Sequence, residues 1–241
     1  MDQLCTWLKA SKFTVVFTGA GMSTESGLPD FRSAQAGLWR SKDPARLAST
    51  HALQHNREEF LDFYRMRIEA LLSCKPHAGH VLLAEWERRG LIQGIITQNV
   101  DGYHQQAGSQ HIAELHGSLT TLSCLVCEKT YTAARYQEEN GWVCPCGGFL
   151  RPDVVLFGEA LPASAFEQAL NWTEQADLFL VLGSSLSVSP ANWFPQQAKE
   201  RGARLVIVNR EPTILDDLAD AVIHERSIGE VLKEMDLAMK K

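Results

Sequence analysis

The sequence predicts an α/β fold, in which an open parallel sheet carries a helical insertion and a small zinc-binding module. Three observations favour it: short apolar runs alternate with amphipathic stretches, polar motifs follow several of these runs, and two pairs of cysteines lie close together. With 241 residues and 45% hydrophobic content, the chain can bury a full core as one domain of moderate size that carries an inserted module. We therefore expect a Rossmann-like sheet with its ligands at the carboxyl ends of the strands.

Six apolar runs are expected as buried parallel strands, because they are too short for helices and several are rich in β-branched residues. They cover residues 13–18, 91–97, 154–157, 178–182, 205–208 and 221–223. Helices are expected over residues 57–73, 77–89 and 190–201. The Rossmann-like core is predicted from residues 1–35, 91–117 and 151–241 of the single unit 1–241, with a helical insertion at 36–90 and the zinc module at 118–150.

Charge and hydropathy narrow the classes of partner. The net charge of -6 argues against a nucleic-acid footprint, although a local basic groove stays open as an alternative. No apolar run is long enough to span a membrane. The chain opens Met1-Asp2-Gln3-Leu4 without the features of a signal peptide, so a cytoplasmic location is expected.

Four cysteines form the most specific motif, Cys124-x2-Cys127 and Cys144-Pro145-Cys146. Thiolates paired at this spacing can close a tetrahedron around zinc, and four sulfurs leave no open position for water, so the ion is expected to be structural. The alternative, two disulfides, requires an oxidising compartment. The remaining cysteines, Cys5 and Cys74, are expected as apolar fillers or free thiols.

The first strand ends in a glycine motif, Gly19-Ala20-Gly21. Glycines in this position allow a backbone to approach a pyrophosphate at the start of a helix, but a tight turn explains them as well. As a dinucleotide fingerprint the motif is incomplete, because Thr24 stands in the place of the third glycine and no acidic residue follows at the usual distance. The next loop adds Asp30, Phe31 and Arg32, which could fold over bound phosphates and ribose.

A second polar cluster follows the strand predicted at 91–97. Gln98, Asn99 and Asp101 supply two amides and a carboxylate, which suit a ribose diol and a carboxamide, although a turn rich in Asn and Asp is the alternative. His116 comes next to Gly117, between this cluster and the cysteines. A histidine with a purely structural role is the simpler interpretation. We favour a general base because His116 lies between the amide cluster and the cysteines.

These motifs together resemble the sirtuin family of NAD-dependent protein lysine deacylases. The resemblance covers about residues 10–225, and it rests on residues 19–23, 27–32, 97–101, 116–117, the four cysteines, 183–186 and 208–209. It implies that later strand ends hold the adenosine end of NAD, which explains the missing acid. The cofactor-binding residues implied are Gly19, Ala20, Gly21, Thr24, Asp30, Phe31, Arg32, Gln98, Asn99, Val100, Asp101, Gly183, Ser184, Ser185, Asn209 and Glu211.

The same resemblance implies a reaction. The amide oxygen of an acylated lysine attacks the ribose carbon that nicotinamide leaves, and the products are free lysine, nicotinamide and O-acyl-ADP-ribose. His116 and Asn99 are the implied catalytic residues, His116 by activating a ribose hydroxyl, while Phe31 and Arg32 exclude water. The acyl-lysine protein or peptide is expected to add as a strand. The residues implied to bind it are Val154, Val155, Leu156, Phe157 and Gly158.

One helix bears on the acyl group. Residues 60, 64, 67 and 71 fall on one stripe, which puts Arg67 on the apolar face beside Tyr64. Together with the small Ala48, Tyr64 and Arg67 resemble the pattern of sirtuins that accept succinyl or malonyl lysine. Without the family, an arginine that snorkels from the helix edge is the simpler interpretation.

Three alternatives stay open. The enzyme could be a deacetylase only, it could transfer ADP-ribose to protein side chains, or the chain could be a non-catalytic NAD sensor or zinc-ribbon interaction module. We favour the deacylase because a pure binding module needs no general base beside a complete amide cluster. A monomer is expected.

Overall fold

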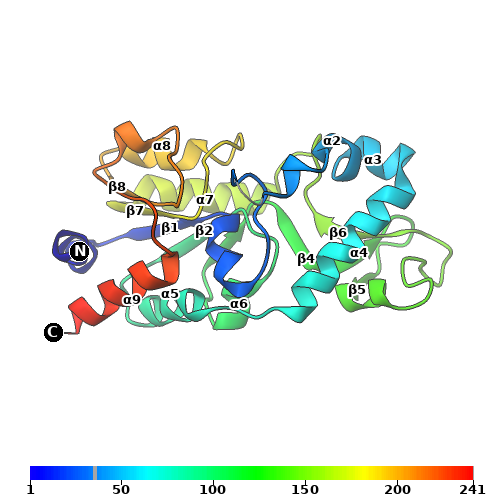
Figure 1. Ribbon diagram of the computed structural model, residues 1–241, viewed down its shortest axis with the longest axis horizontal. Coiled ribbons are helices and arrows are strands. Elements are labelled where there is room, and N and C mark those ends of the chain that lie inside the picture. The colour runs from blue at the N-terminus through cyan, green and yellow to red at the C-terminus, as the bar shows by residue number, and fades with distance from the viewer. Residues whose placement is uncertain (35–36, 241) are drawn as a thin grey trace.

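The computed structural model describes residues 1–34 and 37–240, and its larger lobe is built on a parallel sheet (Figure 1). The strands of this sheet are β1 (Thr14–Thr18), β2 (Gly94–Thr97), β3 (Ile112–Glu114), β7 (Leu178–Leu182), β8 (Arg204–Val208) and β9 (Ala221–Ile223). Their order is β3-β2-β1-β7-β8-β9, and every neighbouring pair is parallel. The order reverses between β1 and β7, which is where ligands bind in open α/β sheets.

Helices cover both faces of this sheet. One face carries α1 (Asp2–Ala10), α5 (Ala78–Arg88) and α9 (Ile228–Met239), and the other carries α7 (Ala163–Gln175) and α8 (Trp193–Glu200). Successive strand residues alternate between the two layers, so that Val16 packs in the first layer while Val15 and Phe17 pack in the second. Because both faces are buried, the strands appear in the sequence as continuous apolar runs.

The smaller lobe joins the region around the four cysteines to three helices. β4 (Gly117–Cys124), β5 (Thr130–Thr132) and β6 (Leu150–Val154) form an antiparallel sheet in the order β5-β4-β6. The helices α2 (Pro44–Leu47), α3 (Thr50–His55) and α4 (Arg57–Ser73) complete this lobe, and one apolar cluster joins Ala52 and Phe60 of α3 and α4 to Leu122 of β4. In Figure 1 this lobe lies at the opposite end of the long axis from the two termini.

Several short elements complete the described part of the chain. The helix α6 (Tyr103–Ala107) follows β2 and packs against α5. The 3₁₀ helices of the described residues are η1 (Ala20–Ser26), η2 (Leu38–Arg40), η3 (Ala133–Gln137) and η4 (Asp216–Leu218). The predicted limits of the core, the helical insertion and the zinc module stay predictions. The helix α5, which falls within the predicted helical insertion, packs with α9 against one face of the large sheet. Within the described ranges, no helix is both long and apolar enough to cross a membrane.

Several predicted elements are confirmed. The strands at 178–182 and 221–223 and the helix at 57–73 have the predicted bounds. The strands predicted at 13–18 and 91–97 begin later, at Thr14 and Gly94, and the one predicted at 205–208 begins at Arg204. The helix predicted at 77–89 has His77 as its N-cap, because the imidazole accepts a hydrogen bond from the amide of Gly79 at 3.1 Å.

The prediction of a parallel strand at 154–157 is wrong. β6 ends at Val154 and pairs antiparallel with β4 in the small sheet. Beyond it the chain turns, because the amide of Leu156 donates to the Glu159 carboxylate at 2.8 Å, and the Phe157 side chain is 45% exposed. A four-residue apolar run shows that a segment packs against something, and its length alone does not say which sheet it joins.

Candidate active site and metal site

A cavity of about 470 Å³ opens at the carboxyl ends of the parallel strands, between the two lobes. Its walls include all the residues predicted to bind cofactor or acyl-lysine peptide or to act in catalysis. They are Gly19, Ala20, Gly21, Thr24, Asp30, Phe31, Arg32, Ala48, Tyr64, Arg67, Gln98, Asn99, Val100, Asp101, His116, 154–158, Gly183, Ser184, Ser185, Asn209 and Glu211. The size suits a ligand that is buried over most of its surface.

Three glycines bring the ends of β1 and β7 together at the reversal point. The amide of Gly21 donates to the carbonyl of Gly183 at 2.9 Å. A Cβ added to Gly19 would lie 2.8 Å from the Gly183 oxygen, and one added to Gly183, whose φ is +66°, would lie 2.3 Å from the amide nitrogen of Met22. The first requirement for glycine here is therefore contact between two backbones, which also leaves the cavity floor free of side chains.

The amide cluster after β2 is held in place by hydroxyl groups. Gln98 Nε2 donates to Ser184 Oγ at 2.8 Å, and Asn99 Nδ2 donates to Ser23 Oγ at 3.2 Å. Ser23 in turn donates to the Asp101 carboxylate at 2.6 Å. Sequence analysis assigned Ser23 no role, because a serine in a polar loop carries no signal of its partners. These bonds fix the side chains on the β2 side relative to η1.

Burial changes the charge balance of this cluster. Asp101 is 6% exposed, and burial raises the pKa of its carboxyl group above the ordinary value. Hydrogen bonds from Ser23 and from the Tyr103 amide act in the opposite direction. The carboxylate therefore depends on these donors to stay ionised at the cavity wall.

The loop after η1 folds over the cavity and is fastened at several points. The amides of Leu38 and Trp39 each donate at 3.0 Å, to the carbonyls of Asp30 and Phe31 respectively. The Phe31 and Trp39 rings stack with their centroids 5.3 Å apart. Sequence analysis did not include Trp39 in the site. The side chain of Glu211, from beyond β8, accepts a bond from the amide of Ala34 at 2.8 Å, and so links the loop to the far end of the crevice.

His116 follows β3 and lies where the large lobe passes into the small one. Its Nδ1 lies 2.9 Å from the carbonyl oxygen of Gln98, and because a carbonyl only accepts, Nδ1 carries the hydrogen and Nε2 has a free lone pair. Burial lowers the pKa of the imidazole below its ordinary value, the bond to Gln98 opposes this, and the charge of Arg32 lowers it further. A neutral ring at neutral pH is what a general base requires.

Gly117, next to His116, has a reason other than access for a substrate. Its φ is +71°, and a Cβ there would lie 2.1 Å from the Asp153 carbonyl oxygen. The glycine therefore allows β4 to lie against β6, and the amide of Val155 then donates to the His116 carbonyl at 2.9 Å.

Arg67 of α4 points into the cavity instead of away from it. Its guanidinium carbon lies 5.6 Å from the centre of the Tyr64 ring and 5.0 Å from that of Phe31. Burial lowers the pKa of the guanidinium, and Tyr64 and Asp101 oppose that shift. Ala48, which was predicted to lie in the same pocket as Tyr64 and Arg67, also lines the cavity. The snorkelling interpretation is therefore wrong for Arg67.

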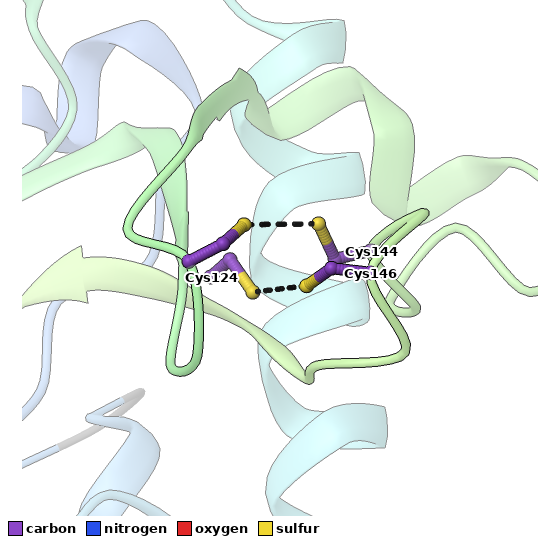
Figure 2. Close-up of side chains that lie close together, drawn as sticks. Cys124, Cys144 and Cys146 are labelled. Atoms are coloured by element: carbon purple, nitrogen blue, oxygen red, sulfur yellow. Dashed lines mark hydrogen bonds between the residues drawn. The ribbon is translucent and has the colours of Figure 1, made fainter.

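The four predicted cysteines lie close together in the small lobe. The side chain of Cys124 faces those of Cys144 and Cys146 from a separate loop (Figure 2). The ligand atoms of the four cysteines all lie within 4.8 Å of one another, with Cys124 and Cys146 3.5 Å apart and Cys127 and Cys144 3.6 Å apart. A disulfide needs about 2.05 Å, whereas the edges of a zinc–thiolate tetrahedron with bonds of about 2.3 Å are roughly 3.8 Å long. The cluster fits a structural zinc ion, and the short Cys-Pro-Cys spacing does not prevent it.

The fold and the site define a class, an α/β nucleotide-binding protein with a structural metal module. The profile of the Sir2 family matches residues 19–190, and the chain belongs to this family. A protein of Geobacillus kaustophilus named NAD-dependent protein deacetylase 1 is 60% identical over 232 residues, 96% of either chain. One of Oceanobacillus iheyensis, named NAD-dependent protein deacetylase, is 56% identical over 229 residues, 95% of this chain and 97% of that one.

Solved structures agree with this assignment. A structure described as Sir2 with a p53 peptide and NAD+ superposes with a TM-score of 0.90 at 37% identity, over 100% of this chain and 99% of that one. Another, described as Sir2Tm bound to a propionylated peptide, gives a TM-score of 0.86 at 37% identity and covers 97% of this chain and 96% of that one.

Proposed function

We propose that this protein is an NAD-dependent protein lysine deacylase that removes acetyl groups and also succinyl or malonyl groups from lysine side chains. Nicotinamide, O-acyl-ADP-ribose and free lysine are the products. The observation that carries the proposal is His116, a neutral imidazole whose free Nε2 belongs to the wall of a cavity already lined by the amide cluster. Curated relatives at 56% identity and above carry the name deacetylase.

NAD supplies an electrophilic ribose carbon when nicotinamide leaves, and the residues of this chain bind and orient it. Ala20 and Gly21 present a floor without bulky side chains to the pyrophosphate. Asn209 and Glu211 hold the adenosine end, and Asn99 and Asp101 hold the nicotinamide end beside Ser23. Thr24, Asp30, Gln98, Val100, Gly183, Ser184 and Ser185 complete the proposed contacts.

His116 is the proposed general base. Its Nδ1 stays bound to the Gln98 carbonyl, so that Nε2 is free to take a proton from a ribose hydroxyl. Asn99 positions the ribose or the attacking water, and Phe31 and Arg32 on the overlying loop exclude bulk water.

The acyl end of the cavity supports the finer part of the proposal. A guanidinium and a phenol beside each other can hold a carboxylate with charge-assisted hydrogen bonds. Tyr64 interacts with Arg67, and the small Ala48 keeps the space above them open. An acetyl group is smaller and fits the same space.

The peptide is proposed to lie along Val154, Val155, Leu156, Phe157 and Gly158. Part of this backbone is already paired, because the amide of Phe157 donates to the Ala48 carbonyl at 2.9 Å and the Phe157 carbonyl accepts from the Thr50 amide at 3.1 Å. The peptide therefore pairs with the remaining groups of the run. A monomer in the cytoplasm stays a prediction.

The test uses the purified protein with matched acetyl-lysine and succinyl-lysine peptides, with and without NAD. Loss of acyl mass only with NAD, together with nicotinamide release, supports the deacylase. A mass gain of ADP-ribose on the protein substrate, with the acyl group retained, contradicts it in favour of the transferase.

The double substitution Tyr64→Phe and Arg67→Met tests acyl choice at saturating NAD. We expect the ratio of succinyl to acetyl activity to fall about tenfold or more, because roughly 1.5–3 kcal/mol is typical of a lost bond to a charged group. An equal loss on both peptides contradicts the acidic-acyl pocket and leaves a deacetylase only.

A further inference from the structure

The guanidinium of Arg67 lies against three aromatic rings. Its central carbon is 5.0 Å from the ring centre of Phe31, 5.6 Å from that of Tyr64 and 5.7 Å from that of Phe63. Tyr64 and Phe63 belong to the same helix, α4, but Phe31 comes from the loop that covers the cofactor end of the cavity. The contact with Phe31 therefore joins two parts of the site.

Besides these rings, Arg67 is stabilised by the hydroxyl group of Tyr64 and by the charge of Asp101. Within the part of the chain that the structure describes, none of the ion pairs shorter than 4.0 Å includes Arg67, in contrast to the pairs of Arg46, Arg151 and Arg201. A guanidinium that leaves water without a carboxylate is costly, and the faces of aromatic rings are the surfaces on which it is best accommodated. Phe31 supplies the nearest of these faces.

Phe31 is at the same time part of a fixed arrangement. Its ring stacks on Trp39 with centroids 5.3 Å apart, and Trp39 lies 5.6 Å from Phe63 of α4. The Phe31 carbonyl accepts a hydrogen bond from the Trp39 amide at 3.0 Å. Phe31 and Trp39 thus rest on α4 through two contacts, Phe31 on Arg67 and Trp39 on Phe63.

We propose that Arg67 is a positioning residue for the cofactor site: its guanidinium holds the Phe31 ring against α4 and so strengthens NAD binding whichever acyl group is present. The inference rests on the proposed use of NAD. It is compatible with recognition of an acyl carboxylate, because rings occupy the faces of the guanidinium while a carboxylate binds to its N–H edge.

The helix offers a matched control. Arg65 lies two residues away on α4, and its guanidinium carbon is 5.2 Å from the Trp142 ring, on the side of the cysteine module. It is absent from the cavity lining. Arg65→Met therefore removes the same charge and the same kind of aromatic contact from the same helix, away from the loop.

The experiment measures initial rates on an acetyl-lysine peptide, which has no carboxylate on the acyl group, over a range of NAD concentrations. For Arg67→Met we expect the KM for NAD to rise about 3- to 10-fold, the range that one cation–π contact provides, while kcat changes less than about twofold. Arg65→Met should keep the wild-type KM. Arg67→Lys, which retains the cation, should recover part of the loss.

A second pair of variants separates the loop contact from any defect in folding. Phe31→Leu should raise the KM for NAD by a similar factor. The double variant of Phe31→Leu with Arg67→Met should have a KM no higher than that of the more impaired single variant, because both substitutions remove the same contact. Calorimetric titration with NAD alone should show the same order of affinities.

The outcomes are distinguishable. Equal values of the NAD KM in Arg67→Met and Arg65→Met, or multiplying effects of Phe31→Leu and Arg67→Met, would overturn the positioning role. A wild-type protein that binds NAD without removing any acyl group would overturn the proposed function instead, and the calorimetric comparison of the variants would still test the contact between Arg67 and Phe31.

Discussion

The two lobes are stabilised in different ways although they share one cavity. The large lobe buries a parallel sheet between two apolar layers, with Val16 on one side and Phe17 on the other. The small lobe joins a three-stranded antiparallel sheet to helices α3 and α4 through one apolar cluster, in which two of the cysteines, Cys124 and Cys144, take part. In a small module of this kind, a structural metal ion can fix the loops that carry its ligands. The large lobe therefore holds its ligand site by packing, and the small lobe by its metal site.

Each lobe contributes one part of the cavity wall. The wall proposed to bind the cofactor comes from strand ends of the large lobe such as Gly19 and Gly183. The wall proposed to bind the acyl group comes from the small lobe through Tyr64, Arg67 and Val154. Treatments that break one lobe should therefore affect one half of the reaction first.

The largest effect is expected from loss of the metal. Cys144→Ser, or a strong chelator, should unfold the small lobe and abolish deacylation, because binding of a structural zinc ion contributes on the order of 10 kcal/mol to such modules. Circular dichroism, metal content and activity report the change. Cys74→Ser, whose thiol lies outside the cluster, is the matched control and should keep both metal and activity. A zinc-free protein with full activity would contradict the role of the four cysteines.

The second effect tests the packing of the large lobe. Gly183→Ala places a methyl group 2.3 Å from the Met22 amide nitrogen, so we expect a loss of at least about 3 kcal/mol in the free energy of unfolding and loss of NAD binding. Gly90→Ala is the control, because Gly90 has a similar φ of +71° but no atom within 4 Å of the added Cβ. It should cost only the backbone term of about 1 kcal/mol. Denaturant titration checks both, and equal losses would contradict the contact between β1 and β7.

The third effect is the response of the large lobe to acid. His80 and His104 are almost fully buried with ring centroids 5.0 Å apart, and both nitrogens of His80 lack a hydrogen-bond partner in the described chain. Burial, together with neighbouring imidazoles that include His77, lowers the pKa of His80 to about 2 and that of His104 to about 3. Both rings therefore stay neutral in the folded state, whereas the unfolded chain takes up protons below about pH 6.5.

The sign follows from this difference in bound protons. The free energy of unfolding has its full value above about pH 6.5. It falls as the pH drops below this, by up to about 1.4 kcal/mol per pH unit for each of the two histidines. His80→Leu should flatten the dependence of the unfolding free energy on pH between 6.5 and 4.5, while His55→Gln, at an exposed position, should leave it as in the wild type. A chelator acts on the small lobe, and acid on the large one. Identical slopes for His80→Leu and wild type would contradict this account.

The same contrast explains which parts the sequence could predict. The core strands were predictable because burial on both faces makes runs such as 178–182 apolar throughout, and their polar ends then placed Gln98, Asn99 and Asn209 at one edge. The cysteine spacing sufficed for the metal site. In the small lobe, where the sheet is antiparallel and its register shifts between β4 and β6, the prediction for the run 154–157 is wrong.

Other features depend on contacts that leave no local pattern. The strand before His116, β3, has only three residues and ends in Glu114, too short to show a period. The stripe on α4 placed Arg67 on the correct face, but only the fold brings Phe31 to it. Hydrophobic periodicity records that a side chain is buried, and it does not record its partner across the chain.

The smallest predicted effect concerns His116, which stands where the two lobes meet. Because burial and Arg32 lower the pKa of this imidazole and the neutral form is the base, kcat/KM for the peptide should rise with pH through a midpoint below 6.5. Arg32→Gln removes a positive neighbour, which should move this midpoint upward even though the rate itself falls. Arg40→Gln, an exposed residue of η2, is the control and should leave the midpoint in place. A midpoint that stays fixed in Arg32→Gln would mean that the fall in kcat/KM at low pH belongs to another group. The histidines His80 and His104 would then be the first to examine. Their protonation accompanies unfolding, so its midpoint would shift with denaturant, whereas that of His116 would not.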